Sequence, residues 1–187
     1  MANPKALIKT YLPKLVGLFL FDAVWFAAVA GRGEWLALTL VLVAAQVVLA
    51  LRTGPFSWRL YVALLVLGLA LEASVVSMGI LRFSEGWLPI WLVLLWVGFV
   101  GMLMNTLSGL AGRPWWAALL GIASGPLTYA IGARLGAAEI LVEEWLLWLV
   151  YGLLWAAYMV IFALVSQRIK QTQEGSHDVI SNSSQSS

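Results

Sequence analysis

The chain has 187 residues, of which 62% are hydrophobic and only 11% are charged. Soluble domains are about half apolar and about a quarter charged, so this composition excludes an ordinary water-soluble fold and indicates one compact membrane domain. The net charge is +2, but the basic residues lie between apolar runs rather than in a stripe with aromatic residues, which excludes nucleic-acid binding.

Six apolar runs follow one another, each close to the roughly 20 residues that a helix needs to cross a bilayer. They cover residues 15–31, 35–51, 60–81, 88–110, 115–135 and 145–167. Short connections with glycine or proline separate them, so neighbouring helices should run antiparallel. The sequence therefore predicts an all-α polytopic protein, a six-transmembrane-helix bundle over residues 15–167. Residues 1–14 form a basic N-terminal segment, and residues 168–187 form a polar tail that we expect to be disordered.

The first run could also be read as a signal peptide, because Ala28-Val29-Ala30 resembles a cleavage site between small residues. Asp22 within the run, and Trp25 and Phe26 near that site, instead favour a helix that the mature protein retains. We therefore treat residues 15–31 as the first transmembrane helix.

Lys and Arg residues are shared unevenly between the two ends of the predicted helices. The end with the N-terminus holds Lys5, Lys9, Lys14, Arg52, Arg59, Arg113, Arg168 and Lys170, and the other end holds Arg32, Arg82 and Arg134. Cytoplasmic loops carry the excess of basic residues in membrane proteins. We therefore predict that both termini are cytoplasmic. Most of the eleven tryptophans lie near helix ends, as expected for an aromatic belt, whereas Trp25, Trp96 and Trp155 lie deeper.

Two acidic residues lie near the middle of predicted helices, Asp22 in the first and Glu72 in the third. An ionised carboxylate at that depth costs at least about 2.5–3.5 kcal/mol. No Lys or Arg lies at a matching depth, so we expect both acids to face the bundle interior and at least one to be protonated at pH 7. They are candidates for a ligand anchor or a proton relay. The alternative is a structural hydrogen bond between helices.

Asn105 lies in the half of the fourth helix nearer the N-terminal side of the membrane, where it could bond one of the acids. A lone asparagine in such a helix more commonly joins two helices. Trp25 and Trp96 lie deeper than the aromatic belt, and Tyr129 lies in the fifth helix. These residues complete the candidate set for ligand binding or proton relay, which is Asp22, Glu72, Asn105, Trp25, Trp96 and Tyr129.

The fifth helix contains two glycine pairs with GxxxG spacing, Gly121 with Gly125 and Gly132 with Gly136. Such pairs let helices approach closely, within a bundle or in a homodimer. Pro126 removes one backbone donor and predicts a kink. Broken helices often line binding sites in membrane proteins, although a kinked helix can also serve packing alone.

Cysteine is absent, and the only histidine, His177, lies in the polar tail. These facts exclude disulfides and a Cys nucleophile, and a zinc or haem site would lack its usual ligands, so we expect no metal and no cofactor. No GxSxG, HExxH or P-loop motif is present, and we predict that the protein is not an enzyme.

Several segments resemble a family of small bacterial inner-membrane proteins catalogued as a domain of unknown function. They are 22–26, 88–99, 103–105, 121–129 and 132–136, and the resemblance extends over roughly residues 15–165. It implies a multi-pass protein of the bacterial inner membrane. Genes of the family often lie near those of cyclopropane-fatty-acid-synthase-like enzymes and flavin-dependent oxidoreductases, which implies a role with membrane lipids. Thr106-Leu107 stands where the family commonly carries His and Ser, which weakens a relay through Asn105.

Our main hypothesis is a protein that binds or presents a membrane lipid or another amphipathic molecule. A polar pocket of Asp22, Glu72 and Asn105 would hold the polar group, and the deep tryptophans would contact the apolar part. A lipid-modifying enzyme or a transporter could be its partner. The main alternative is a small solute carrier, or a vitamin-capture subunit of an energy-coupling-factor transporter that docks through Ala23 and Ala27. An enzyme acting within the membrane and a structural role are further alternatives.

Overall fold

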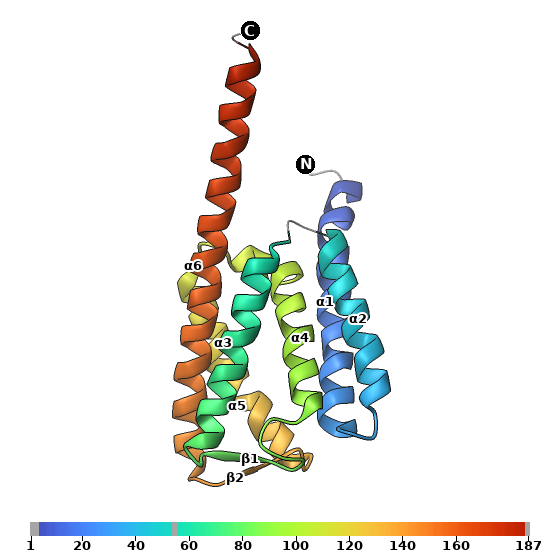
Figure 1. Ribbon diagram of the computed structural model, residues 1–187, viewed down its shortest axis with the longest axis vertical. Coiled ribbons are helices and arrows are strands. Elements are labelled where there is room, and N and C mark those ends of the chain that lie inside the picture. Colours follow the sequence, from blue (N-terminus) through green and yellow to red (C-terminus); the bar gives the residue numbers. More distant parts are fainter. Residues whose placement is uncertain (1–3, 54–55, 186–187) are drawn as a thin grey trace.

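The computed structural model describes the backbone of residues 4–53 and 56–185 and the side chains of residues 11–53 and 56–172. The helices are α1 (Pro4–Gly31), α2 (Leu36–Thr53), α3 (Trp58–Ser77), α4 (Ile90–Asn105), η1 (Ser108–Leu110), α5 (Pro114–Arg134) and α6 (Glu144–Gln185). The α-helices run lengthwise as one bundle, and both termini lie at the same end (Figure 1). We call this end the terminal end. The strands β1 (Leu81–Phe83) and β2 (Ala138–Ile140) lie at the opposite end, the strand end.

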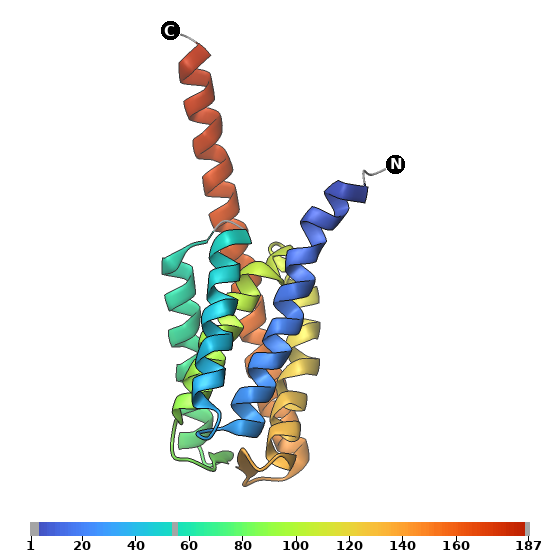
Figure 2. The same cartoon turned by 90° about the vertical axis from the view of Figure 1, so that its right-hand side faces the viewer.

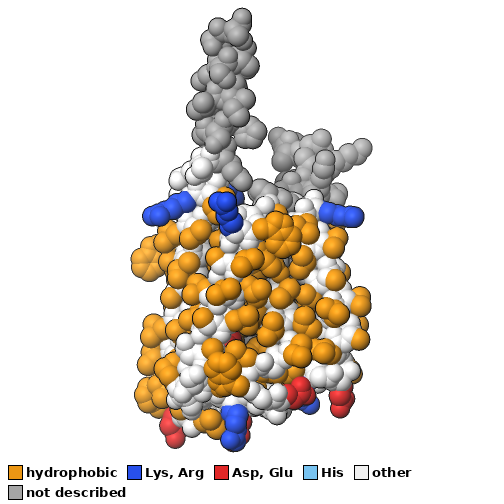
Figure 3. Space-filling model, in the orientation of Figure 1, with side chains coloured by type: hydrophobic (Ala, Val, Ile, Leu, Met, Phe, Trp, Pro, Cys, Tyr) orange, Lys and Arg blue, Asp and Glu red, His pale blue; other side chains and the backbone are white. Residues whose placement is uncertain are grey.

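Among the described residues, five helices (α1, α2, α3, α5 and α6) are long and apolar enough to cross a membrane. A broad band of apolar side chains covers the bundle between two ends that carry the charged residues (Figure 3). Lipid is the solvent in which so many exposed apolar side chains are stable. The prediction of an all-α polytopic membrane protein is confirmed at this level.

The fourth helix is shorter than the predicted range of 88–110, because α4 spans only the 16 residues Ile90–Asn105. Pro89 precedes it in an extended conformation. At its other end the Asn105 and Thr106 side chains donate to main-chain oxygens of α1, and the chain then enters η1. Most residues of α4 are buried against α1, α2 and α3. A helix enclosed by others does not need to span the full apolar band.

The two strands form an antiparallel ladder that the sequence analysis did not predict. Arg82 pairs with Glu139 in the register, and their side chains form an ion pair. The Ser84 amide extends the pairing by donating to the Ala137 oxygen, 3.0 Å away. Segments of three residues carry too little alternation to be recognised as strands. The ladder joins the α3–α4 connection to the α5–α6 connection and covers the strand end of the bundle (Figure 1).

Two helices are longer than the sequence predicts. α1 begins at Pro4 rather than near residue 15, and α6 continues to Gln185 through most of the segment 168–187. Both extensions project past the bundle at the terminal end (Figure 2). A helix satisfies its own backbone hydrogen bonds, so it can continue beyond the apolar run without a partner. Disorder of the tail stays a prediction, and His177 lies outside the residues whose side chains are described.

The bundle has two packing units. α1, α2 and α4 pack against one another, and α5 packs along α6. α3 contacts both units, and its ties are specific: the Tyr61 hydroxyl donates to the Val97 oxygen of α4 at 2.7 Å, and the Tyr158 hydroxyl of α6 donates to the Leu64 oxygen at 3.1 Å. The space between the two units holds the features described next.

Candidate functional site

Among the described residues, the carboxyl of Glu72 on the inner face of α3 accepts the most side-chain hydrogen bonds, and this residue is only 1% exposed. Trp96 of α4 donates from Nε1 to Oε1 at 3.2 Å, and Tyr151 of α6 donates to Oε2 at 3.3 Å. Tyr129 of α5 also donates to Oε1. The Tyr129 and Tyr151 rings stack with centroids 3.7 Å apart. We call these four residues the Glu72 cluster.

The Glu72 cluster joins four helices through one side chain. All three donors are uncharged, and no Lys or Arg forms an ion pair with Glu72 in the part of the chain that the structure describes. An unpaired buried donor costs about 1–3 kcal/mol, so Glu72 stabilises the positions of Trp96, Tyr129 and Tyr151 together. Sequence reasoning singled out Glu72, Trp96 and Tyr129 but missed Tyr151. The only signal for Tyr151 was a tyrosine in the interior of an apolar run.

Trp96 reaches Glu72 because α3 has a glycine where the two helices meet. A Cβ added at Gly68 would lie 2.2 Å from Cζ3 of Trp96, so only glycine fits there. The indole also packs against Phe99, Trp155 and Tyr158, with ring centroids 5.3–5.7 Å apart. Aromatic side chains of α4 and α6, together with Gly68 of α3, therefore fix the position of Trp96.

The glycines of α5 have three different surroundings. Gly121 and Gly125 let α5 approach α6, because a Cβ at either position would lie 2.5 Å from an atom of Trp155. Gly132 faces α1, where an added Cβ would lie 3.7 Å from Cγ1 of Val29.

The sequence predicted that Gly136 pairs with Gly132 to let two helices pack closely. This prediction is wrong, because Gly136 lies beyond the end of α5. It follows the end of α5 with a φ of +77°, and its amide donates to the Ala133 oxygen while the Ala137 amide donates to the Gly132 oxygen. This is the Schellman arrangement that ends helices, for which glycine is the preferred residue.

Pro126, for which the sequence predicts a kink, is buried inside α5.

An apolar cavity of about 400 Å³ lies between α1, α4, α5 and α6. The predicted deep residues Trp25, Trp96 and Trp155 line it, together with Trp91 and Tyr129. Trp96 and Tyr129 thus have two neighbours, the cavity on one side and Glu72 on the other. Glu72 itself does not line the cavity, and it lies behind the wall that these two side chains form.

The cavity opens between α1 and α5, because its most exposed lining residues belong to these two helices. Leu18 of α1 is 39% exposed and Leu120 of α5 is 38% exposed, and Asp22 of α1 is exposed as well. Both helices belong to the apolar band, so this opening faces the surrounding lipid. We call it the mouth and define it by Leu18, Asp22, Leu120, Ser124 and Thr128.

The strand end of the cavity is closed. Arg32 of the α1–α2 turn donates from Nη1 to the Leu135 oxygen at the end of α5, 2.9 Å away. Phe83 of β1 and Ala138 of β2 line the cavity at this end. α1 and α5 are therefore tied at the strand end, and the mouth lies further toward the terminal end.

Asp22 lies at the mouth and forms no hydrogen bond or ion pair with any residue that the structure describes. Across the mouth, Ser124 donates to the Leu120 oxygen and Thr128 donates to the Ser124 oxygen, each at 2.8 Å. Asp22 was predicted to face the bundle interior, but it is exposed at the edge of the cavity. The two acids thus have different surroundings, although both lie beside the same cavity.

Asn105 lies apart from both acids. Its side chain donates to the Pro13 oxygen at 3.2 Å, and Thr106 donates to the Lys14 oxygen at 3.1 Å. A Cβ at Gly17 would lie 2.5 Å from Oγ1 of Thr106, so this glycine lets α1 approach α4 closely. Asn105 therefore joins two helices, which was the alternative in the sequence analysis, and the predicted pocket of Asp22, Glu72 and Asn105 does not form.

The vitamin-capture alternative gains no support from the first helix. It requires Ala23 and Ala27 on a common docking surface, but Ala23 is exposed whereas Ala27 is 2% exposed and lies within the bundle. A partner could not contact Ala27 without displacing neighbouring helices.

A family model with the description "Protein of unknown function (DUF2878)" matches residues 14–161. Searches of curated proteins and of solved structures found nothing similar to this chain. The matched range includes Asp22, Glu72 and every residue that lines the cavity. The resemblance to a family catalogued as a domain of unknown function is confirmed, and the chain belongs to the DUF2878 family.

Proposed function

We propose that this protein binds a membrane lipid or another amphipathic molecule in the cavity between α1 and α5. The observation that carries the proposal is the position of the mouth, between two helices of the apolar band. A molecule dissolved in the bilayer could enter there sideways without passing through water. Transport of a water-soluble solute would instead call for a cavity that opens at one end of the bundle.

The size and lining of the cavity agree with this proposal. Its volume of about 400 Å³ lies within the range of about 300–1,000 Å³ that is typical of sites for small molecules. The walls are mostly aromatic and aliphatic, and the few polar side chains gather at the mouth. Such a site suits a molecule with one apolar chain and one polar group. In this proposal the Glu72 cluster holds the aromatic wall in place and takes no part in a reaction.

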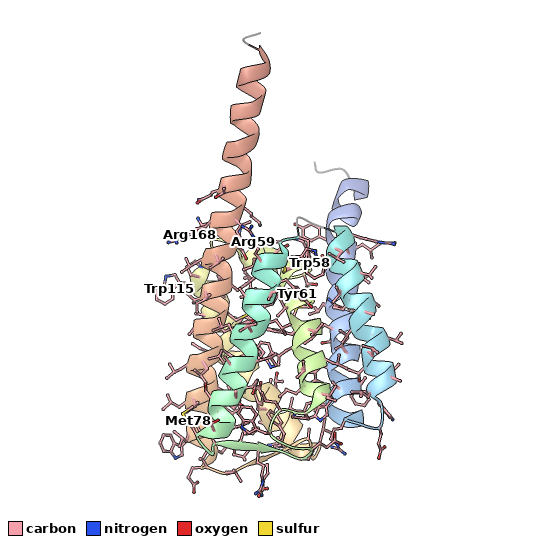
Figure 4. All side chains as sticks on the ribbon, viewed as in Figure 1. Trp58, Arg59, Tyr61, Met78, Trp115 and Arg168 are labelled. Atoms are coloured by element: carbon pink, nitrogen blue, oxygen red, sulfur yellow. The ribbon has the colours of Figure 1, made fainter. Side chains whose placement is uncertain are left out.

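We further propose that the protein lies in the bacterial inner membrane with both termini cytoplasmic. Arg59 and Arg168 lie at the terminal end with Trp58 and Trp115, and Met78 lies at the opposite end (Figure 4). Acidic side chains gather at the strand end (Figure 3). The excess of basic residues at the terminal end favours a cytoplasmic location for that end.

The proposed number of crossings is six, with α4 as the short one. The 16 residues of α4 span about 24 Å at 1.5 Å per residue. Because both termini lie at one end of the bundle, an even number of passes is needed.

The chain has no cysteine, so single-cysteine variants can test this topology. A thiol reagent that cannot cross membranes should label Glu143→Cys in intact cells and Gly109→Cys only after the membrane is opened. Labelling of Gly109→Cys in intact cells would contradict the proposal.

The test of binding uses two substitutions in adjacent residues of α5. Ser124 lies at the mouth, whereas Ala123 is exposed and does not line the cavity. Protein purified in mild detergent should retain a lipid or other amphipathic molecule, detected by native mass spectrometry. We expect Ser124→Trp to lose the bound molecule, because the indole fills the mouth, and Ala123→Trp to keep it. Equal retention in both variants, or no bound molecule in the wild type, would overturn the proposal.

A further inference from the structure

The polar atoms at the mouth are all hydrogen-bond acceptors. Ser124 and Thr128 each donate their one hydroxyl proton to a main-chain oxygen of α5, at 2.8 Å in both cases. Each hydroxyl oxygen can therefore only accept a hydrogen bond from a bound molecule. The third polar side chain, Asp22, has carboxyl oxygens that no described residue contacts through a hydrogen bond or an ion pair.

The neighbouring aromatic groups do not supply protons to the mouth. Tyr129 and Trp96 donate to Glu72, on the far side of the wall. The indole nitrogens of Trp25 and Trp91 have no hydrogen-bond partner among the described residues, but both nitrogens are buried away from the open space of the cavity. No Lys or Arg lines the cavity within the described part of the chain. A bound molecule therefore meets a carboxyl and two accepting oxygens at the entrance to an apolar space.

From this arrangement we propose that the bound amphipathic molecule carries a primary ammonium group, which pairs with Asp22, and one apolar chain, which fills the cavity. This inference rests on the proposed function and names the chemical class of its ligand. An ammonium group has three donors, and the mouth offers three accepting side chains, Asp22, Ser124 and Thr128. The cation also supplies the partner that a carboxylate in the apolar band requires.

Aromatic side chains next to Asp22 favour the same chemistry. Trp25 lies three residues further along α1, so it belongs to the same face of the helix, and it also lines the cavity. The face of an indole attracts a cation. An alkyl carboxylate would place a second negative group beside Asp22, and a phosphate group would do the same. A simple alkylammonium ion is therefore the preferred ligand.

The test compares four single-chain probes on the full-length protein in an uncharged detergent: dodecylammonium, dodecanol, dodecanoate and lysophosphatidylethanolamine. Native mass spectrometry at a series of probe concentrations gives the apparent Kd of each. We expect dodecylammonium to bind about tenfold or more tightly than dodecanol, because a charge-assisted hydrogen bond is about twice as strong as a neutral one. Dodecanoate should bind most weakly. Lysophosphatidylethanolamine should bind less tightly than dodecylammonium, because its phosphate places a second negative charge near Asp22, and tighter binding of it would overturn the preference for a simple alkylammonium ion.

Three variants identify the site of the ammonium group. Asp22→Asn should weaken dodecylammonium about tenfold while leaving dodecanol unchanged, and Asp22→Glu should restore most of the preference. Glu34→Gln is the matched control, because it removes one exposed negative charge outside the cavity. Equal affinity for dodecylammonium and dodecanol, or an unchanged preference in Asp22→Asn, would overturn the inference. If either result occurred while Ser124→Trp still abolished all binding, the proposed function would stand and only the assignment of an ammonium ligand would fail. Binding that Ser124→Trp leaves unchanged would overturn both the proposed function and the inference of an ammonium ligand.

Discussion

The two acids of this protein lie beside the same cavity but in opposite surroundings. Glu72 is almost fully buried and accepts hydrogen bonds from Trp96, Tyr129 and Tyr151. Asp22 is exposed at the mouth and has no partner among the described residues. An acid whose two oxygens both accept hydrogen bonds from neighbouring helices organises the fold, whereas one without a partner is available to a ligand. A charged residue within a membrane is therefore a binding-site candidate when its neighbours leave it without a partner, and depth in the bilayer alone is not sufficient.

The largest expected effect is on stability when the Glu72 cluster loses its centre. Glu72→Leu leaves three buried donors without an acceptor, so we expect the free energy of unfolding to fall by about 3 kcal/mol or more. Glu72→Gln keeps an oxygen for Trp96 and Tyr129 and should cost much less. The measurement is unfolding in mixed micelles with rising dodecyl sulfate, followed by tryptophan fluorescence. A Glu72→Leu protein as stable as the wild type would show that Glu72 does not stabilise the bundle.

Asp22 should respond in the opposite direction. Asp22→Leu removes an unpartnered carboxyl from the apolar band, so we expect the ligand-free protein to gain about 2–3 kcal/mol in the same unfolding assay. The isosteric Asp22→Asn should have a smaller effect on stability. A loss of stability in Asp22→Leu would show that this acid also has a structural partner, and the distinction between the two acids would fail.

A smaller effect should come from the glycine that makes room for Trp96. In Gly68→Ala the new Cβ would lie 2.2 Å from the indole, so Trp96 must move, at a cost of about 1–3 kcal/mol. Because Trp96 contacts both Glu72 and the cavity, this variant should also bind the dodecyl probes less tightly. Gly101→Ala in α4 is the control, since its Cβ would meet Cγ of Gln46 at an ordinary 3.5 Å and Gly101 does not line the cavity. Equal stability of the two variants would show that Trp96 is not held as described.

Much of the membrane architecture could be predicted from the sequence, because long apolar runs leave a chain few alternatives to helices in lipid. Asp22 and Glu72 stood out for the same reason, since acids are rare at that depth. The lengths of α1, α4 and α6 could not be predicted accurately from the sequence. Helix ends beyond the apolar band depend on local contacts, such as those of Asn105 and Thr106 with α1.

The partners of the polar residues could not be predicted. These helices carry apolar residues on every side, so the sequence does not indicate which face of each helix turns inward. The rotation of each helix about its own axis decides whether Asn105 contacts an acid or a main-chain oxygen of α1. It also decides whether Tyr151 contacts Glu72. The ladder of β1 and β2 was missed because its two short strands are joined only by pairing across distant parts of the chain.

The division of the bundle into two packing units has a consequence for biosynthesis. The α1, α2 and α4 unit leaves the ribosome first, whereas the α5–α6 hairpin, which packs through Gly121 and Gly125, follows last. α5 and α6 supply a large part of the cavity wall, so the cavity does not exist until this hairpin has inserted. Until then Asp22 lies on α1 without Ser124 and Thr128 of α5 beside it. A nascent chain halted before Pro114 would therefore contain α1, α2 and α4 but no cavity.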